Sequence, residues 1–396
     1  MSNESPSKPM YEQIFDTLLA QIREGKYKVG DRVPSEKELG DEFKVSRITS
    51  KKALELLAGA GCIVRQPGRG SFVADPRASM AKPAAGGSSV PSYSRRNNGK
   101  LLIGLVITDF GDSYGTELIY GMEEASRNSG CYLVLRRSLG DPATEEEAIT
   151  GLLELGVDGL IIFPAQGEYF NAEILKLVIG KFPFVLVDRH LKGISAGSIS
   201  TDNVRAAIEG TNHLFGLGHK SIAFLSPPPT DTTAIEERIE GFIKAHAEKG
   251  IMVDRELWLE NITSTLPNAN TEENRREDIG KIVAHLRRNP QITALFATEY
   301  NIGELAVEAV RQMGLEVPGD ISVLCFDSPV SNGVYPITHL RQNQLEMGRL
   351  AFESVLKLRA GEPVPGKILL DATLVVGEST GPAKERSAAA ARQRHT

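Results

Sequence analysis

Residues 31–73 read DRVPSEKELGDEFKVSRITSKKALELLAGAGCIVRQPGRGSFV, and they contain the start and stop signals of two short helices and a hairpin. Ser35 and Glu38 have the spacing of a capping box, which predicts a helix that begins after Ser35. Ser46 is a good N-cap for a second helix from Arg47 to about Ala58. The segment PGRG at 67–70 joins two short apolar segments, as in a tight hairpin. We therefore predict a helix, a turn, a second helix and a two-stranded ribbon.

Basic residues dominate the second half of this stretch, although the chain as a whole has a formal net charge of −6. Residues 43–73 contain six lysines and arginines and a single acid, Glu55. A local positive surface on an acidic protein indicates a local anionic partner, of which DNA phosphate is the usual one. A helix surface that contacts only solvent is the alternative. It does not account for the helix, the turn, the basic second helix and the arginine-tipped hairpin together.

The order of motifs in residues 9–75, from PSEKEL through VSR to GRGSFV, resembles the winged helix-turn-helix of GntR-family bacterial transcription regulators. By this resemblance, the residues that would contact DNA are Lys37, Ser46, Arg47, Thr49, Lys51, Gln66, Gly68 and Arg69. Arg47 is the best candidate for a bidentate pair with guanine, and Lys51 and Lys52 for phosphate contacts. Ser50 departs from the family, which usually has an apolar residue there, so either the packing or the predicted helix phase differs.

Composition bounds the remaining possibilities. A chain of 396 residues with 41% apolar content allows two or three domains with ordinary cores. The three cysteines are far apart, the seven histidines show no metal-ligand spacing, and no apolar run is long enough for a signal core or a membrane span. We expect a cytoplasmic protein without a metal or a cofactor.

Residues 76–99 are rich in Ala, Ser, Pro and Gly and contain basic residues but no acid, which predicts a flexible basic linker. Additional non-specific DNA affinity is the alternative role of its basic residues.

From residue 100 onward, apolar segments of strand length alternate with helical patterns. The continuous apolar run at residues 101–107 is typical of a strand buried on both faces of a parallel sheet. Two such series of about five strands each predict an α/β fold with two doubly wound lobes. One of these strands is expected near Leu257–Leu259. The predicted domains are a DNA-binding domain at 1–75, the linker at 76–99, a two-lobed domain at 100–380 and a disordered tail at 381–396.

Several polar residues directly follow predicted strands, where doubly wound sheets bind their ligands. They are Asp109, Asp188, Arg189, Glu299 and Asp327, and Arg238 lies on a helix of the second series. A single Asp at a strand end is usually a cap or turn residue. Several acids and two arginines around one cleft are harder to explain in that way. Together they can hydrogen-bond several hydroxyl groups, as a sugar requires, and Tyr114 can supply an aromatic wall.

A second resemblance covers about residues 100–380, on the segments IGLVITDFGDSYGTELIYGMEEA, LELGVDGLIIFPA, FVLVDRH, STDN, LGHKSIAFLSPP, ERIEGF and VPGDISVLCFDS. These resemble the effector domain of LacI-type regulators, which is similar to periplasmic sugar-binding proteins. By this resemblance the effector contacts are Tyr114, Asp188, Arg189, Arg238, Asp327 and Gln342. The family motif also covers Asp202 and Asn203, which we interpret as structural. Thr298-Glu299 replaces the usual Asn-Asp pair, so the identity of the sugar is not transferable.

These observations predict a sequence-specific transcription regulator, most simply a repressor of carbohydrate-utilisation genes that a sugar releases from double-stranded operator DNA. The resemblance to the LacI family implies a homodimer. An activator with the same sensor is one alternative. A carbohydrate-processing enzyme with a DNA-binding module is another, but no dinucleotide-binding, phosphate-loop, nucleophile-elbow or paired-carboxylate motif supports it.

Overall fold

The computed structural model describes residues 10–59, 62–66, 69–74, 100–165, 171–229, 232–329, 333 and 335–384. The chain divides into two compact units, Met1–Gly99 with Tyr169–Phe182 and Lys100–Glu168 with Pro183–Thr396. The predicted linker at 76–99 lies outside the described residues, as does residue 68 of the predicted hairpin.

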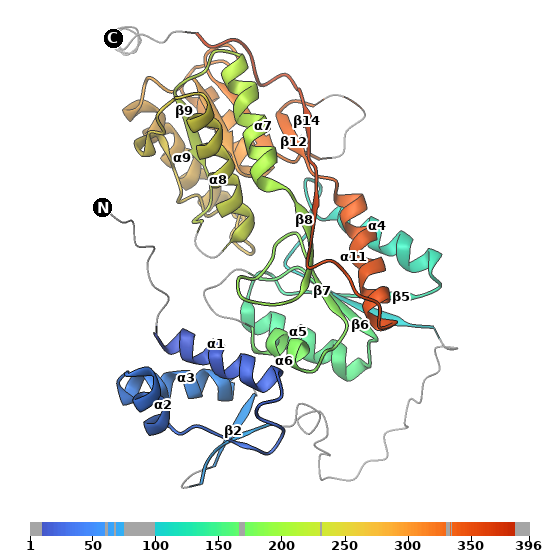
Figure 1. The fold of residues 1–396 in the computed structure, drawn as a ribbon. Coiled ribbons are helices and arrows are strands. Elements are labelled where there is room, and N and C mark those ends of the chain that lie inside the picture. The colour runs from blue at the N-terminus through green and yellow to red at the C-terminus, as the bar shows by residue number, and fades with distance from the viewer. Residues whose placement is uncertain are drawn as a thin grey trace. The chain divides into compact units, whose positions relative to one another are not determined.

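Within residues 10–74, the described part of the first unit contains three helices and a small antiparallel sheet (Figure 1). The helices are α1 (Met10–Arg23), α2 (Glu36–Phe43) and α3 (Arg47–Gly59). The strands are β1 (Arg32–Val33), β2 (Ile63–Gln66) and β3 (Gly70–Val73), in the order β1-β3-β2. The predicted helices and ribbon are confirmed, and β1 adds a third strand that the sequence pattern did not reveal.

Local hydrogen bonds explain where α2 and α3 begin. The Ser35 hydroxyl accepts from the Glu38 N–H at 3.3 Å, and the Glu38 carboxylate accepts from the Ser35 N–H at 2.6 Å, which confirms the capping box. The Ser46 hydroxyl accepts from the Thr49 N–H at 3.3 Å and caps α3. Apolar side chains from α1, α2 and α3, among them Leu18 and Leu39, are buried between these helices.

Ser50 is fully buried, so the predicted phase of α3 is correct. Its hydroxyl donates to the Ser46 carbonyl at 3.4 Å. A Cβ on Gly40 of α2 would lie 3.6 Å from the Ser50 hydroxyl and 3.3 Å from the Val45 carbonyl oxygen. The helices approach so closely here that a small side chain is needed on α3.

The second unit contains two lobes, each built on one sheet. The sheet of lobe 1 is parallel, in the order β13-β8-β7-β6-β4-β5. Its strands are β4 (Leu102–Ile107), β5 (Tyr132–Arg137), β6 (Gly159–Ile162), β7 (Phe184–Val187), β8 (Gly197–Thr201) and β13 (Lys367–Leu370). The helices that follow or precede these strands in the chain are α4 (Thr116–Asn128), α5 (Pro142–Leu155) and α11 (Gln344–Arg359), together with α6 (Ala172–Ile179), which the division of the chain assigns to the first unit.

Lobe 2 has the strand order β14-β12-β11-β10-β9, and only β14 runs antiparallel to its neighbour. Its strands are β9 (Ile222–Leu225), β10 (Ala294–Ala297), β11 (Ser322–Phe326), β12 (Thr338–Arg341) and β14 (Thr373–Val375). Its helices are α7 (Asn203–Gly216), α8 (Thr233–Glu248), the 3₁₀-helix η1 (Arg255–Leu257), α9 (Glu272–Arg288) and α10 (Tyr300–Gln312).

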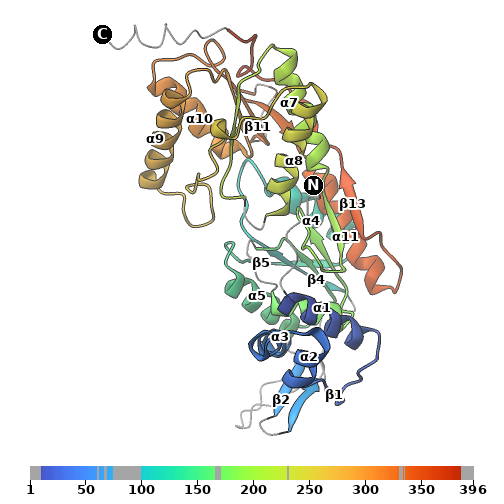
Figure 2. The same ribbon diagram turned by 60° about the vertical axis from the view of Figure 1, so that its left-hand side comes forward.

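Helices cover both faces of each sheet (Figures 1 and 2). In lobe 1, Ile103 packs in one core with residues of α4 and α11, whereas a Cβ on the adjacent Gly104 would meet Leu152 of α5. In lobe 2, Leu324 faces α7 and the adjacent Cys325 faces α10. Burial on both faces accounts for the continuous apolar runs in the strand sequences. The predicted two-lobed α/β fold is confirmed.

Three predictions need correction. The strand expected near Leu257–Leu259 is wrong: η1 is stabilised by an Asp254 cap, and Leu259 makes only an isolated bridge to Leu225. Strict alternation fails after β7, because β8 follows without a helix. The predicted tail also starts too early, since the Ala383 N–H still donates to the Leu217 carbonyl at 2.8 Å.

The chain crosses between the lobes three times within the described residues: between β8 and α7, between β12 and α11, and between β13 and β14. None of Cys62, Cys131 and Cys325 forms a disulfide in the described part of the chain. Among the described helices, none combines the length and the apolar character that crossing a membrane would require.

Candidate functional site

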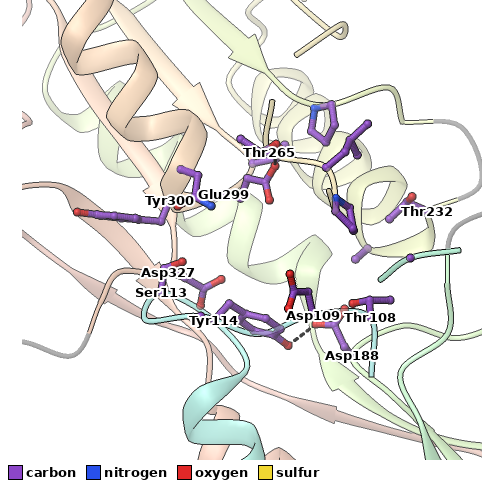
Figure 3. Close-up of a pocket in the computed structure, with 18 of the residues that line it drawn as sticks. Thr108, Asp109, Ser113, Tyr114, Asp188, Thr232, Thr265, Glu299, Tyr300 and Asp327 are labelled. Atoms are coloured by element: carbon purple, nitrogen blue, oxygen red, sulfur yellow. Dashed lines mark hydrogen bonds between the residues drawn. The ribbon is translucent and has the colours of Figure 1, made fainter. Parts of the chain in front are cut away.

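A cavity of about 380 Å³ lies between the two lobes of the second unit, at the carboxyl ends of their strands (Figure 3). All eight residues that the sequence predicted to contact an effector line it: Asp109, Tyr114, Asp188, Arg189, Arg238, Glu299, Asp327 and Gln342. They meet because parallel strands of each sheet end at the same edge. Their role in binding stays a prediction.

The lobe 1 wall is organised around Asp188, which follows β7 with a φ of 69° and is buried. The Tyr114 hydroxyl donates to one of its carboxylate oxygens, as Figure 3 shows. Burial and the charge of Asp188 together raise the pKa of Tyr114 well above its usual value, so the phenol keeps its proton. Arg189 Nε lies 3.4 Å from the other Asp188 oxygen, and its guanidinium lies 4.7 Å from the centre of the Phe163 ring.

The lobe 2 wall contains a second buried guanidinium. Arg238 of α8 donates from Nε to the Asn203 side-chain oxygen at 2.9 Å and from Nη1 to the Thr298 carbonyl. Its guanidinium carbon lies 3.8 Å from the centre of the Phe326 ring, within cation–π range. Asn203 therefore has the structural role that we expected, and Asp202 caps α7. Arg238 is fixed in place before any ligand arrives.

Asp327, which follows β11, is buried, and only one of its two carboxylate oxygens is hydrogen-bonded within the described residues. Its Oδ2 accepts from Gln342 Nε2 at 2.7 Å, whereas its Oδ1 has no hydrogen-bond partner among the described residues. Burial raises the pKa of Asp327 to about 7, against the opposing effect of Arg238. Gln342 Oε1 accepts from the Thr201 hydroxyl at 2.6 Å. Both ends of the Gln342 amide are thus engaged within the protein, and Gln342 positions Asp327.

The remaining two predicted carboxylates differ in their surroundings. Glu299 accepts from the Thr265 hydroxyl at 2.6 Å, and burial raises its pKa. The Asp109 side chain is 44% exposed and pairs with Arg137 at 3.0 Å. Asp109 therefore belongs to the entrance of the cavity, and Glu299 to its interior.

Sequence reasoning named Thr298 only as part of a replaced family motif and missed Thr108, Thr232 and Thr265, which also line this cavity. Thr232, Thr265 and Thr298 all line it, and the hydroxyls of Thr232 and Thr298 are buried without a partner in the described part of the chain. Arg189 Nη1 is likewise unpartnered there. No motif distinguishes a threonine that points into a cavity from one that ends a strand. Together with Asp327 Oδ1, these atoms are donors and acceptors of cavity-lining residues that have no partner in the described part of the chain.

The predicted DNA-contacting residues are described within the first unit, except Gly68. The exposed ones are Lys37, Ser46, Arg47, Lys51, Lys52 and Arg69, whereas Thr49 and Gln66 are partly buried. A groove of about 720 Å³ between α2, α3 and the ribbon is lined by Lys37, Arg47 and Gln66, among others. Lys51 pairs with Glu55 at 3.7 Å. The Lys52 ammonium lies 4.1 Å from the centre of the Tyr11 ring, which leaves it less free than Lys51 to follow a phosphate.

Glu36 is a residue of this groove that the sequence reasoning missed. Its carboxylate accepts from Arg47 Nε at 3.1 Å and pairs with Arg65, and the hydrogen bond from Arg47 lowers its pKa. It lies before residue 43, outside the stretch in which the basic residues were counted. Part of the predicted positive charge is therefore neutralised in the free protein.

Comparison with known proteins agrees with this division of the chain. Residues 10–73 match the model of bacterial regulatory proteins of the gntR family, and residues 211–380 match that of a periplasmic binding protein-like domain. The chain is similar to an arabinose metabolism transcriptional repressor from Geobacillus stearothermophilus, at 27% identity over 379 residues that cover 94% of this chain and 98% of the relative. A second repressor of that name, from Halalkalibacterium halodurans, is 26% identical and covers 96% of this chain and 99% of its own length. Among solved structures, a LacI family regulator from Enterococcus faecium with bound ribose matches 72% of this chain and 100% of its own, with a TM-score of 0.59 and 22% identity, which indicates a shared fold.

Proposed function

We propose that this chain, which carries a GntR-family helix-turn-helix domain followed by a periplasmic binding protein-like domain, is a transcriptional repressor that an uncharged sugar releases from its operator. Repressors of arabinose metabolism that align with nearly the whole chain support the proposal. Arabinose is accordingly the first candidate effector, and its identity is part of the proposal.

The observation that carries the proposal is the set of unsatisfied polar atoms in the cavity. Arg189 Nη1, Asp327 Oδ1 and the hydroxyls of Thr232 and Thr298 are buried and have no partner among the described residues. Each buried polar atom that lacks a hydrogen bond costs about 1–3 kcal/mol. A polyhydroxylated ligand supplies hydroxyls that both donate and accept, so it can satisfy all four.

The charges of the cavity favour an uncharged ligand. Four carboxylates line it, and only the guanidiniums of Arg189 and Arg238 oppose them. Both guanidiniums are already held, by Asp188 and by Asn203 with the Thr298 carbonyl. A sugar phosphate would bring about two further negative charges next to the four carboxylates, so we expect the cavity to reject it.

In the proposed mechanism the protein exists in two states, one that binds the operator and one with low affinity for it. The sugar in the cavity changes the populations of these two states. A homodimer would present two helix-turn-helix domains to a near-palindromic operator. The sugar releases DNA only if it binds the low-affinity state more tightly than the DNA-competent one. A tenfold loss of operator affinity requires about 1.4 kcal/mol of coupling.

A thermal-shift screen with L-arabinose, D-ribose, cellobiose and ribose 5-phosphate tests this function. We expect at least one uncharged sugar to raise Tm, because a ligand at one hundred times its Kd stabilises the native state by about 2.7 kcal/mol. The Arg238→Ala variant should lose that shift while keeping its DNA affinity. A response to ribose 5-phosphate alone, or to none of the sugars, would contradict the proposal.

A further inference from the structure

Gly140 of lobe 1 and Pro267 of lobe 2 meet at the rim of the cavity, and both line it. A Cβ on Gly140 would lie 2.8 Å from Pro267 Cγ and 3.3 Å from Pro267 Cβ. Separations below about 3 Å lie well inside the van der Waals contact range for two carbon atoms. The two lobes therefore touch here with no room for one added methyl group.

This contact lies on the side of the cavity away from the interlobe connections. Gly140 follows β5, which is one edge strand of the lobe 1 sheet, whereas the chain leaves that sheet after β8 and β13 at the other edge. In lobe 2, the segment before Pro267 continues from Leu259, which bridges Leu225 of the edge strand β9. The crossings enter or leave lobe 2 near β12 and β14, at the opposite edge. A rotation of one lobe relative to the other about these connections would therefore separate Gly140 from Pro267 at the start of lobe opening.

Both sides of the contact are held firmly by their own lobe. The turn of Gly140 is fixed by the Leu139 N–H, which donates to the Thr108 carbonyl at 2.8 Å, and by the Asp141 N–H, which donates to the Ser138 carbonyl at 3.0 Å. On the other side, Asp278 is fully buried and accepts from the N–H groups of Thr263 and Ser264 at 2.9 and 2.7 Å. Lys281 pairs with Asp278 at 2.7 Å. Neither turn can easily yield to a larger side chain.

We propose that the Gly140–Pro267 contact is the latch that holds the two lobes together over the ligand, and that it restricts the ligand to one that fits the cavity of about 380 Å³. This volume is near the lower end of ligand pockets, which span about 300–1,000 Å³. The latch proposal depends on the proposed repressor function in one respect only, namely that the ligand is a sugar. Closure itself is a property of the two lobes and is measurable without any ligand.

Three variants isolate the contact from backbone strain. Gly140→Ala adds the methyl group at a residue whose φ is +71°. Gly130→Ala is the matched control, because Gly130 has a φ of +63° and nothing within 4 Å of its added Cβ. The double variant Gly140→Ala with Pro267→Ala removes Pro267 Cγ, the carbon nearest the new methyl group, and leaves Cβ at 3.3 Å. If backbone strain alone were responsible, Gly140→Ala and Gly130→Ala would have equal effects. Adding Pro267→Ala would then not reverse the effect of Gly140→Ala.

The interlobe distance is measured in the full chain by pulsed electron–electron spin resonance. Spin labels are placed through Leu155→Cys in lobe 1 and Met252→Cys in lobe 2, which are 57% and 90% exposed in the wild type. The partly exposed Cys131 is replaced by Ser, and labelled protein is diluted with an excess of unlabelled protein to suppress distances between chains. Distances are recorded without ligand and with L-arabinose. Without ligand, we expect Gly140→Ala to shift the population toward longer distances, Gly130→Ala to leave it unchanged and the double variant to restore it.

Calorimetry with L-arabinose then links closure to binding. We expect Gly140→Ala to weaken binding at least tenfold relative to Gly130→Ala, and the double variant to recover most of that loss. The latch proposal would be wrong if Gly140→Ala and Gly130→Ala gave equal interlobe distance distributions both with and without L-arabinose. It would also be wrong if the wild type never showed the short interlobe distance of the closed state. If the wild type bound no sugar of the screen, the proposed function would fail while the ligand-free distances still decided the latch.

Discussion

Arg238 in the cavity and Arg47 on α3 have the same side chain in opposite surroundings. Arg238 is 7% exposed, donates to two oxygen atoms and stacks on Phe326. The Arg47 side chain is 84% exposed and pairs with Glu36. One guanidinium is fixed before it meets a ligand, and the other is free to reorganise around one.

This difference indicates two modes of recognition in one chain. A preorganised cavity selects a small molecule by shape and by hydrogen bonds, because its polar atoms are desolvated before binding. An exposed basic surface attracts a long polyanion, and its strength comes largely from released counterions. The predictions below separate the two modes, beginning with the largest expected effect.

Salt should separate the two modes most clearly. The logarithm of DNA affinity should fall linearly with the logarithm of salt concentration, by about 0.9 per phosphate neutralised. With about 6–10 phosphate contacts, the loss between 50 and 200 mM salt is on the order of 10³–10⁵-fold. Sugar affinity should change by less than about twofold, because no net charge is exchanged with solvent. Fluorescence anisotropy and calorimetry over the same salt series measure both, and parallel salt dependences would contradict the distinction.

Arg238→Ala should have the second largest effect. The variant leaves the Asn203 side-chain oxygen and the Thr298 carbonyl without their donor, at a cost of about 1–3 kcal/mol of stability each, and sugar affinity should fall by more than about 100-fold. Denaturant unfolding and calorimetry measure the two losses. Arg238→Lys is the second variant: it keeps the charge but cannot reproduce both hydrogen bonds and the stack on Phe326, so it should fold and still bind weakly. Wild-type sugar affinity in Arg238→Lys would show that Arg238 lies outside the binding site.

Asp327 predicts a pH dependence that the exposed surface lacks. Its folded pKa of about 7 lies above the unfolded value of about 3.9, so the folded state binds more protons between these values. Its contribution to stability is complete below about pH 4 and is lost as the pH rises through 7. Asp327→Asn should therefore be more stable than the wild type at pH 8, by a few kcal/mol, and equal to it near pH 4. Thermal unfolding across this range measures the difference, and parallel curves for the two proteins would refute it.

Arg47→Ala should give the smallest of these effects but the most selective one. A bidentate pair with guanine contributes about 1–3 kcal/mol of discrimination, so preference for the operator over unrelated DNA should fall about 10–100-fold. Lys51→Ala is the control, since loss of a phosphate contact weakens binding to all sequences alike. Competition assays with specific and random duplexes measure the preference. Equal losses of preference in both variants would place base recognition elsewhere.

The sequence predicted the parts of the molecule that depend on local signals. The capping box at Ser35 and the apolar run at 101–107 each define an element without reference to the rest of the chain. Five of the eight cavity residues, Asp109, Asp188, Arg189, Glu299 and Asp327, were predicted because the carboxyl ends of parallel strands converge by topology. Gln342 was predicted only by the resemblance to LacI-type regulators. The polar strand β12, with the sequence THLR, was missed because its burial depends on β11, β14 and the helices that cover it.

Contacts between distant segments explain the rest of what sequence reasoning missed. Gly140 reads as an ordinary turn glycine, and only the approach of Pro267 from the other lobe gives it a second role. Glu36 reads as a helix N-terminal acid, and only the fold brings Arg47 and Arg65 to its carboxylate. Gln342 was correctly placed at the cavity, but its hydrogen bonds to Thr201 and Asp327 engage its amide within the protein.

The most direct test of sugar-controlled DNA binding uses a duplex selected by the wild-type protein from random sequences. Its affinity for the full chain is measured by fluorescence anisotropy without sugar and with a saturating sugar that calorimetry has shown to bind. We predict at least a tenfold loss of operator affinity in the wild type, and no loss in Arg238→Lys at the same sugar concentration. Unchanged operator affinity in a wild-type protein with its cavity occupied would contradict the account.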